Sequence, residues 1–93
     1  MNLDFEWDKT KAEENYAKHG VSFEMAKRVF QDPFAAEFLD DREDYGEERF
    51  VILGMVEGQV LYVAYTERNE VFRIISARRA TQHEQEIYLE ESS

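Results

Sequence analysis

The sequence predicts an α+β protein in which two N-terminal helices and one C-terminal helix cover an antiparallel sheet of three to four strands. Two observations favour this class. Helix-capping residues flank apolar-patterned segments near both ends of the chain, and three strand-like runs joined by connections of hairpin length fill its second half. A chain of 93 residues can bury one modest core, so we expect residues 1–93 to form a single domain.

The first helix is predicted from Lys9 to about Lys18. Asp8 precedes it as a suitable N-cap, and Gly20 follows it as a residue that readily adopts the left-handed conformation found after helix ends. Before this helix, residues 1–8 include alternating aromatic and acidic side chains. They are expected to form a short strand or an extended arm that lays its aromatic rings on the core.

A second helix is predicted from Phe23 to Phe30, with Ser22 as its N-cap. Asp32-Pro33 ends it, because proline disfavours a helical conformation in the residue before it. Residues 34–39 are expected to add a strand to the sheet. The segment 37–48 holds seven acidic residues and one arginine, a charge density that predicts a solvated loop.

The sheet itself is predicted from three runs rich in β-branched and aromatic residues, which are Arg49–Val56, Gln59–Thr66 and Val71–Ala77. Their short connections indicate a meander. The closing helix begins with a capping box, in which Thr81 is the N-cap and Glu84 the third helical residue. Ile87 and Tyr88 are expected to anchor this helix to the sheet.

Three of the seven arginines lie in the segment 72–80. Side chains on a regular strand alternate between faces, which predicts one face with Phe72, Ile74, Ser76 and Arg78 and another with Arg73, Ile75 and Ala77. Two interpretations stay open. Either the arginines pair with some of the many surface carboxylates, or a rigid strand presents guanidinium groups to an anion, which their planar donor fork suits.

The composition excludes several classes of protein. No cysteine is present, so neither a disulfide nor a thiolate metal site can form. The clustered Asp40, Asp41 and Asp44 match no calcium-loop spacing, and no metal or cofactor is predicted. The chain has no apolar run of bilayer-spanning length and no basic, apolar leader, so we expect a cytoplasmic protein that does not contact membranes.

The formal net charge of −10 is unusual for a protein that binds nucleic acid, because phosphate contacts normally require a basic surface. The basic residues would have to gather in one place. Otherwise the chain binds a basic protein partner, or, on charge alone, imitates a nucleic acid.

Five basic side chains form a candidate set for metal-independent RNA cleavage: Lys18, His19, Arg49, Arg73 and Arg78. Histidine or lysine can move protons to and from the ribose 2′-hydroxyl and the leaving oxygen, while arginines hold the phosphate. The alternative for Lys18 and His19 is that they only satisfy the C-terminal end of the first helix. Candidates for contacts to RNA or a protein partner are Arg79, Tyr65 and Tyr88, although such tyrosines are more often core residues.

The following segments occur in order between Phe5 and Tyr88: Phe5-Glu6-Trp7-Asp8, Lys18-His19-Gly20-Val21-Ser22-Phe23, Asp32-Pro33, Glu48-Arg49-Phe50, Tyr65-Thr66 and Arg73-Ile74-Ile75-Ser76-Ala77-Arg78-Arg79-Ala80. Together they resemble the BrnT toxin family. The resemblance implies a RelE-like fold and a ribonuclease toxin of a type II toxin–antitoxin pair that inhibits translation. It also implies a BrnA-like ribbon-helix-helix antitoxin, encoded beside the toxin, through which the pair contacts DNA indirectly.

The last helix differs from the family pattern, because no arginine or lysine follows Thr81 where the resemblance implies basic residues. Two functions therefore stay open. The first is an endoribonuclease whose five basic residues gather in one concavity. The second is a degenerate toxin that binds its antitoxin and acts as a co-repressor. In either case the N-terminal part of the antitoxin is expected to cover the arginine strand.

Overall fold

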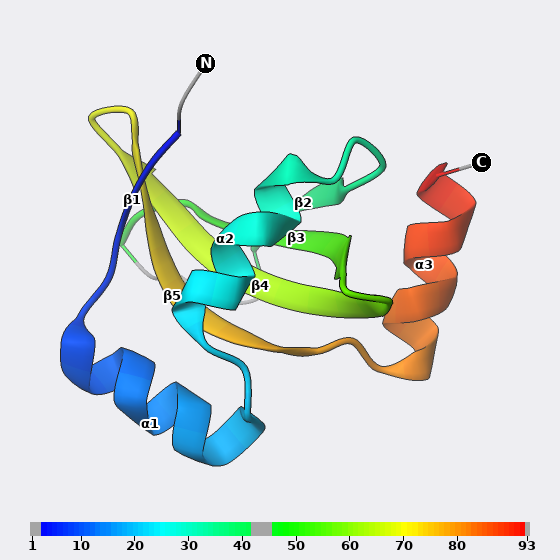
Figure 1. The fold of residues 1–93 in the computed structure, drawn as a ribbon. Helices are drawn as coiled ribbons and strands as arrows, with labels where there is room; N and C mark the ends of the chain where they lie inside the picture. Colours follow the sequence, from blue (N-terminus) through cyan, green and yellow to red (C-terminus); the bar gives the residue numbers. More distant parts are fainter. Residues whose placement is uncertain (1–2, 42–45, 93) are drawn as a thin grey trace.

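The computed structural model describes residues 3–41 and 46–92 and has the expected α+β architecture. Its elements, in chain order, are β1 (Asp4–Glu6), α1 (Lys9–His19), α2 (Phe23–Lys27), the 3-10 helix η1 (Arg28–Gln31), β2 (Ala36–Asp40), β3 (Arg49–Val56), β4 (Gln59–Arg68), β5 (Val71–Arg79) and α3 (Gln82–Ser92). Figure 1 shows α1 and α2 at the left and front of a twisted sheet, with α3 at its right.

The sheet has five strands in the order β1-β5-β4-β3-β2. It is mixed, so the predicted antiparallel sheet of three to four strands had too few strands and lacked the parallel pair. Strands β2 to β5 are antiparallel to their neighbours, whereas β1 pairs with β5 in parallel. Residues 1–8 were expected to form a strand or an arm, and the strand is confirmed for Asp4–Glu6. Sequence alternation over three residues cannot show that their partner is Val71–Arg73, more than sixty positions away.

Residues 34–39 were expected to add a strand to the sheet, and β2 confirms this strand with its bounds at Ala36–Asp40. The overlapping prediction of a loop over the acidic segment 37–48 is therefore wrong for its first part. Residues 37–40 belong to β2, which pairs with β3 from Ala36–Leu53 to Asp40–Arg49. The apolar Phe38 and Leu39 supply enough β-forming character to overcome the neighbouring charges. Asp44, one of the clustered aspartates, lies outside the described residues.

The predicted helix ends are confirmed by their hydrogen bonds. Asp8 accepts from the Lys11 amide at 2.9 Å, and Thr81 and Glu84 bond each other's amides at 2.9 and 3.2 Å. Gly20 ends α1 with a φ of 70°. None of the helices in residues 3–41 and 46–92 is long and apolar enough to cross a membrane.

The second helix ends earlier than predicted. It is α-helical only over Phe23–Lys27 and then tightens into η1. The tighter turn sets the fully buried Val29 against Gly54 of β3, where a Cβ atom would lie only 2.6 Å from Val29 Cγ1. The close approach of η1 to the sheet therefore depends on glycine at this position.

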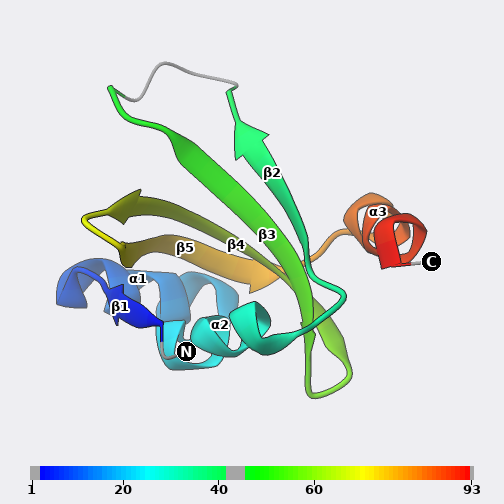
Figure 2. The same ribbon diagram turned by 90° about the horizontal axis from the view of Figure 1, so that it is seen from above.

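The main core lies between α2, η1 and one face of the sheet, which we call the core face. It contains Phe23, Ala26, Val29, Ile52, Leu61, Val63, Tyr65, Ile74 and Ala77. The opposite face carries a smaller core, in which Tyr88 of α3 packs on Val51 and Leu53. Figure 2 shows α3 beside β2 and β3, apart from α1 and α2, so α3 covers only part of this second face.

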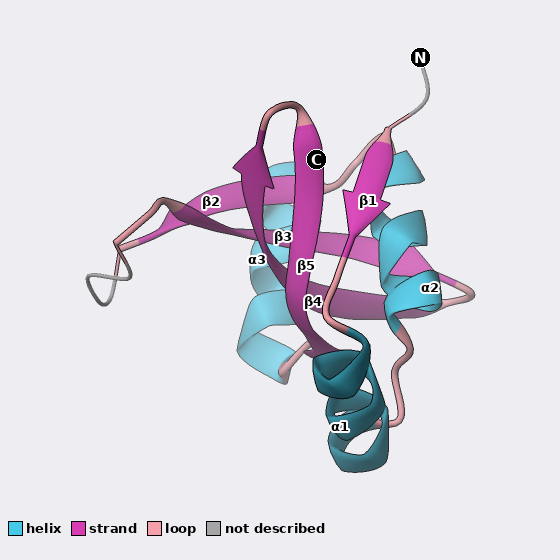
Figure 3. Ribbon diagram, turned by 90° about the vertical axis from the view of Figure 1, so that its left-hand side faces the viewer, coloured by secondary structure: helices cyan, strands magenta, loops and turns pink. Residues whose placement is uncertain are grey.

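The side-chain amide of Asn15 joins α1 to the open edge of β5. It donates to the carbonyl of Ala77 at 2.8 Å and accepts from the amide of Ala77 at 3.1 Å, and it also donates to the carbonyl of Val21 at 3.0 Å. Figure 3 shows β1 alongside one part of β5 and α1 at its lower end. Asn15 thus substitutes for a neighbouring strand where β1 does not reach.

Replacing Asn15 by alanine is expected to lower the free energy of unfolding by about 2–4 kcal/mol, because buried backbone groups of Ala77 and Val21 lose their partners. Urea denaturation followed by circular dichroism measures the change. The control is Glu14→Ala, which alters the exposed neighbour on the same helix. Equal stability of the two variants would contradict the role assigned to Asn15.

Candidate functional site

Three predicted site arginines share the sheet face that α2 and η1 do not cover, which we call the arginine face. Arg73 pairs across to Thr66 of β4, and Arg78 pairs with Tyr62 of the same strand. Arg49 precedes Phe50, the partner of Tyr65, so continuing this register places Arg49 beside Thr66. Because Tyr62 and Thr66 are four residues apart on one strand, the three arginines lie on the same side.

A β-bulge in β5 is the reason that Arg73 and Arg78 share a face. Ile74 pairs with Tyr65, but the next pair along the ladder joins Ser76 to Ala64, so Ile75 is an extra residue. The prediction from strict alternation, which put Arg73 and Arg78 on opposite faces, is therefore wrong. The inserted residue reverses the facing of every side chain that follows it.

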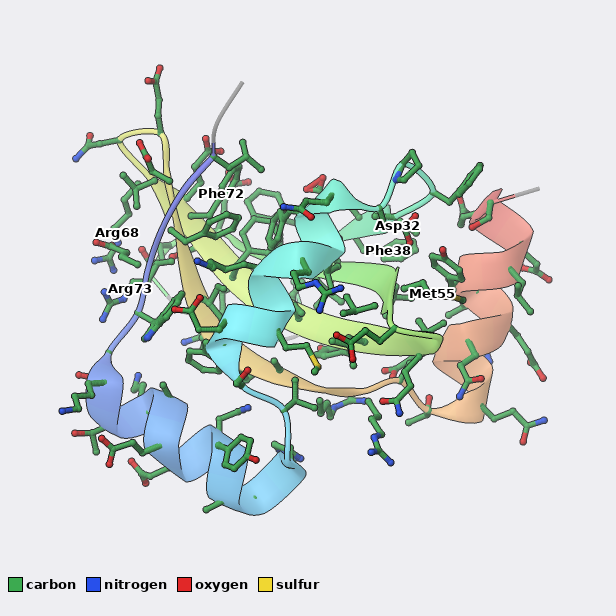
Figure 4. All side chains as sticks on the ribbon, in the orientation of Figure 1. Asp32, Phe38, Met55, Arg68, Phe72 and Arg73 are labelled. Atoms are coloured by element: carbon green, nitrogen blue, oxygen red, sulfur yellow. The ribbon has the colours of Figure 1, made fainter. Side chains whose placement is uncertain are left out.

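The end of the arginine face farthest from α3 collects several charges. Arg68 donates from Nε and Nη2 to the two carboxylate oxygens of Glu47, each at 2.9 Å, and Arg73 Nη1 lies 3.5 Å from Glu6 Oε1. Figure 4 shows Arg68 and Arg73 near one another at this end, far from α3. The hydroxyl of Thr66 is buried here and has no hydrogen-bond partner among the described residues.

The pKa of Glu47 reports the local excess of positive charge. Hydrogen bonds from Arg68 lower it most, and the charges of Arg68, Arg49 and Arg73 lower it further. The hydrogen bonds between Arg68 and Glu47, together with the charge of Glu47, raise the pKa of Arg68. Four charged side chains from β3, β4, β5 and the segment before β3 are therefore close enough to influence one another.

Arg78 lies nearer to α3 and is held in place on two sides. Its Nη1 and Nη2 donate to the carboxylate of Glu84 at 2.8 and 3.0 Å, and its guanidinium carbon lies 3.9 Å from the centre of the Tyr62 ring. Burial of Glu84 acts to raise its pKa, but hydrogen bonds from Arg78 and Thr81 outweigh this effect and lower it. Tyr62, the partner of Arg78, and Thr66, the partner of Arg73, are four positions apart in β4, which is about 13 Å along an extended strand.

The helix α3 is fixed beside the arginine face by the hydroxyl of Tyr88, which donates to Asp32 at 2.6 Å. The amides of Met55 and Phe34 also donate to this carboxylate, at 2.7 and 2.9 Å. Burial acts to raise the pKa of Asp32, but these three hydrogen bonds outweigh it and lower the pKa. Burial and the contact with Asp32 raise the pKa of Tyr88 to about 12.

Lys18 and His19 belong to α1, whereas the three site arginines belong to β3 and β5. Both residues end α1 at the edge of β5; Lys18 is exposed and His19 is half-buried. The three arginines share one sheet face, and the gathering of all five basic residues in one concavity stays a prediction.

The remaining candidates have different environments. Tyr65 is 2% exposed on the core face, and its hydroxyl donates to Glu37. Tyr88 is 5% exposed, on the side of α3 that packs against β3. Neither ring is open to a stacking base. Arg79 is exposed at the end of β5, on the core-face side of the strand.

Sequence reasoning missed Arg68, Thr66 and Glu47 as neighbours of the site. Extending the β4–β5 hairpin register inward from its turn would have found two of them, since Val71 faces Arg68 and Arg73 faces Thr66. Glu47 carries no such signal, because it lies outside the strands. The residue is placed by its two bonds with Arg68.

The arrangement is suited to holding an anion. Guanidinium groups bind phosphate through paired, charge-assisted hydrogen bonds, and Arg49 and Arg73 flank a buried hydroxyl of Thr66. Among the described residues no cluster of three histidine or acidic side chains has the geometry to hold a metal ion.

Residues 7–84 match the model of a protein family described as the ribonuclease toxin BrnT of type II toxin–antitoxin systems. The match includes β3 to β5 and all three arginines of the arginine face. A search of curated proteins found no matching relative.

Replacing Tyr88 by phenylalanine is expected to lower the free energy of unfolding near pH 7 by about 1 kcal/mol, because the bond to Asp32 is lost while the ring stays packed. The difference from the wild type should shrink below about pH 4, since a carboxyl with a lowered pKa loses its stabilising effect as it is protonated. It should also shrink above about pH 10, where an unfolded tyrosine ionises before Tyr88 does.

Urea denaturation at several pH values tests this profile, with Tyr16→Phe as the control at an exposed tyrosine of α1. A Tyr88→Phe difference that stays constant from pH 2 to pH 11 would show that Asp32 and Tyr88 are not coupled.

Proposed function

The chain belongs to the BrnT family of ribonuclease toxins from type II toxin–antitoxin systems, and we propose that it cleaves RNA without a metal ion on its arginine face. The observation that carries this proposal is the position of Arg49 and Arg73 on either side of Thr66. These three residues lie side by side on the adjacent strands β3, β4 and β5. A phosphodiester group of RNA supplies the matching anion.

The proposed chemistry is attack of a ribose 2′-hydroxyl on the adjacent phosphorus, with departure of the 5′-oxygen. Negative charge increases on the phosphate oxygens in the transition state, and fixed guanidinium groups stabilise that charge most. Arg49 and Arg73 would hold the phosphate, and Arg78 would hold a neighbouring one. Proton transfer by Lys18 and His19 stays a prediction, because both residues lie at the β5 edge and not on the arginine face.

The acidic partners of the arginines do not prevent RNA binding. Ion pairs on exposed surfaces contribute only about 0–1 kcal/mol, so a phosphate can displace Glu6 from Arg73 at little cost. These carboxylates also hold the guanidinium groups near their working positions before RNA arrives, which reduces the entropy lost on binding.

We further propose the finer features that the family suggests. The partner would be a BrnA-like ribbon-helix-helix antitoxin, cleavage would inhibit translation, and DNA would be contacted only through the antitoxin. The helices and the sheet are consistent with a RelE-like arrangement, which we include in the proposal.

A second function has its own support in the ion pairs. Arg68, Arg73 and Arg78 each have a carboxylate partner, and α3 carries no arginine or lysine. A chain whose arginines are neutralised by these carboxylates would bind its antitoxin without cleaving RNA and would act as a co-repressor. Growth arrest on expression of the chain alone separates the two functions, because only the nuclease would cause it.

Arg49→Ala and Arg73→Ala are each expected to slow cleavage of a single-stranded RNA by about 100-fold, the usual effect of removing one fixed donor to transition-state charge. Cleavage by the wild type should persist in EDTA. The rate is measured on end-labelled RNA in gels.

The matched control is Arg28→Ala, which removes an exposed arginine of η1 that pairs with Glu57. Wild-type rates for the two arginine-face variants, with folding verified by circular dichroism, would exclude this face as the active site. Loss of wild-type cleavage in EDTA would contradict metal independence.

A further inference from the structure

An apolar pocket of about 250 Å³ lies on the same side of the sheet as the arginines, at the end next to α3. Its floor is formed by Val51 and Leu53 of β3 with Tyr62 of β4, and Phe38 of β2 and Ile87 of α3 flank it. Phe38 keeps 38% of its surface exposed. Figure 4 shows Phe38 on the α3 side of the molecule, away from Arg68 and Arg73. We call this site the acidic-rimmed pocket.

The charges around the pocket are negative. Asp41 is exposed at its rim, and Glu84 lines it while bonded to Arg78. Asp40 also lines the pocket. The helix α3, which contributes Glu84 and Ile87 to the lining, contains Glu86, Glu90 and Glu91 elsewhere and has no lysine or arginine. An apolar cavity surrounded by carboxylates repels phosphates, so RNA is a poor occupant. A second copy of this chain, with its own net charge of −10, is repelled as well.

We propose that the acidic-rimmed pocket is the anchoring site for a segment of the antitoxin that presents one large apolar side chain flanked by lysine or arginine. The apolar side chain would fill the space between Phe38 and Ile87. Its basic neighbours would pair with Asp41 and with the glutamates of α3. The inference rests on the proposed function for the existence of an antitoxin, and it adds the place and chemistry of the contact.

The position of the pocket explains how such a segment inhibits. Tyr62 belongs to the pocket floor and also lies under the guanidinium of Arg78. A segment that continues from the pocket along β4 crosses Arg78 and then reaches Thr66, which Arg49 and Arg73 flank. A segment anchored in the pocket therefore lies beside Arg78 and, through Asp40 of the lining, next to Arg49, and the inhibition is occlusion of the face that the arginines occupy.

The test uses the full chain and the antitoxin encoded beside its gene, with affinity measured by isothermal titration calorimetry. Phe38→Ala is expected to raise Kd at least about 10-fold, as loss of a central apolar anchor does. Asp41→Lys is expected to raise Kd about 10-fold at low salt and less at high salt, because the lost attraction is screened.

Two matched variants serve as controls. Phe34→Ala removes another exposed phenylalanine, outside the pocket, and Glu14→Lys makes the same charge reversal on α1. Both should change Kd by less than about twofold. If Phe38→Ala does not fold, Asp41→Lys carries the test together with NMR of the unaltered protein, in which antitoxin should shift the signals of Tyr62 and Ile87.

Equal affinities for all four variants, or Tyr62 and Ile87 signals that move with an RNA oligonucleotide and not with antitoxin, would overturn the inference. Failure of the proposed function would look different. A wild type that cleaves no RNA, but whose antitoxin complex is weakened by Phe38→Ala and Asp41→Lys, would refute the nuclease and support the pocket.

Discussion

The placement of the whole candidate site depends on one extra residue in the pairing of β4 with β5. Ile75 has no partner in β4, so Ile74 and Ala77 both face the core although three positions separate them. The same insertion turns Arg73 and Arg78 to the opposite face. A strand without the bulge could satisfy either the core or the arginine pair, but not both, since alternation would place one arginine among apolar side chains.

A single sheet face then carries two different chemistries. At one end Arg49 and Arg73 flank Thr66, whose hydroxyl is buried, and Arg68 follows two residues later in β4. At the other end Asp40, Asp41 and Glu84 contribute to the lining of an apolar pocket. Arg78 lies between them. The net charge of the chain is −10, yet Arg49, Arg68 and Arg73 gather near Glu47 on this face, and exposed charges farther away than about 8 Å are largely screened at physiological salt.

The helix α3 has a structural role at this boundary. Tyr88 fixes it through Asp32, a residue of the turn that follows η1, and Glu84 fixes Arg78. Glu84 also belongs to the lining of the acidic-rimmed pocket. The absence of lysine and arginine from α3 agrees with this position, because the helix contributes Glu84 to the lining of the pocket and lies apart from Arg49 and Arg73.

The sequence by itself determined what local forces decide. The caps Asp8 and Thr81, the end of α1 at Gly20 and the bounds of β3 follow from residues within a few positions of one another, and all were predicted. The tertiary structure decided the rest. The parallel pairing of β1 and the bulge at Ile75 depend on which distant segments share the core. No periodicity within a strand records that choice, because it is the packing between segments that makes one register more stable than another.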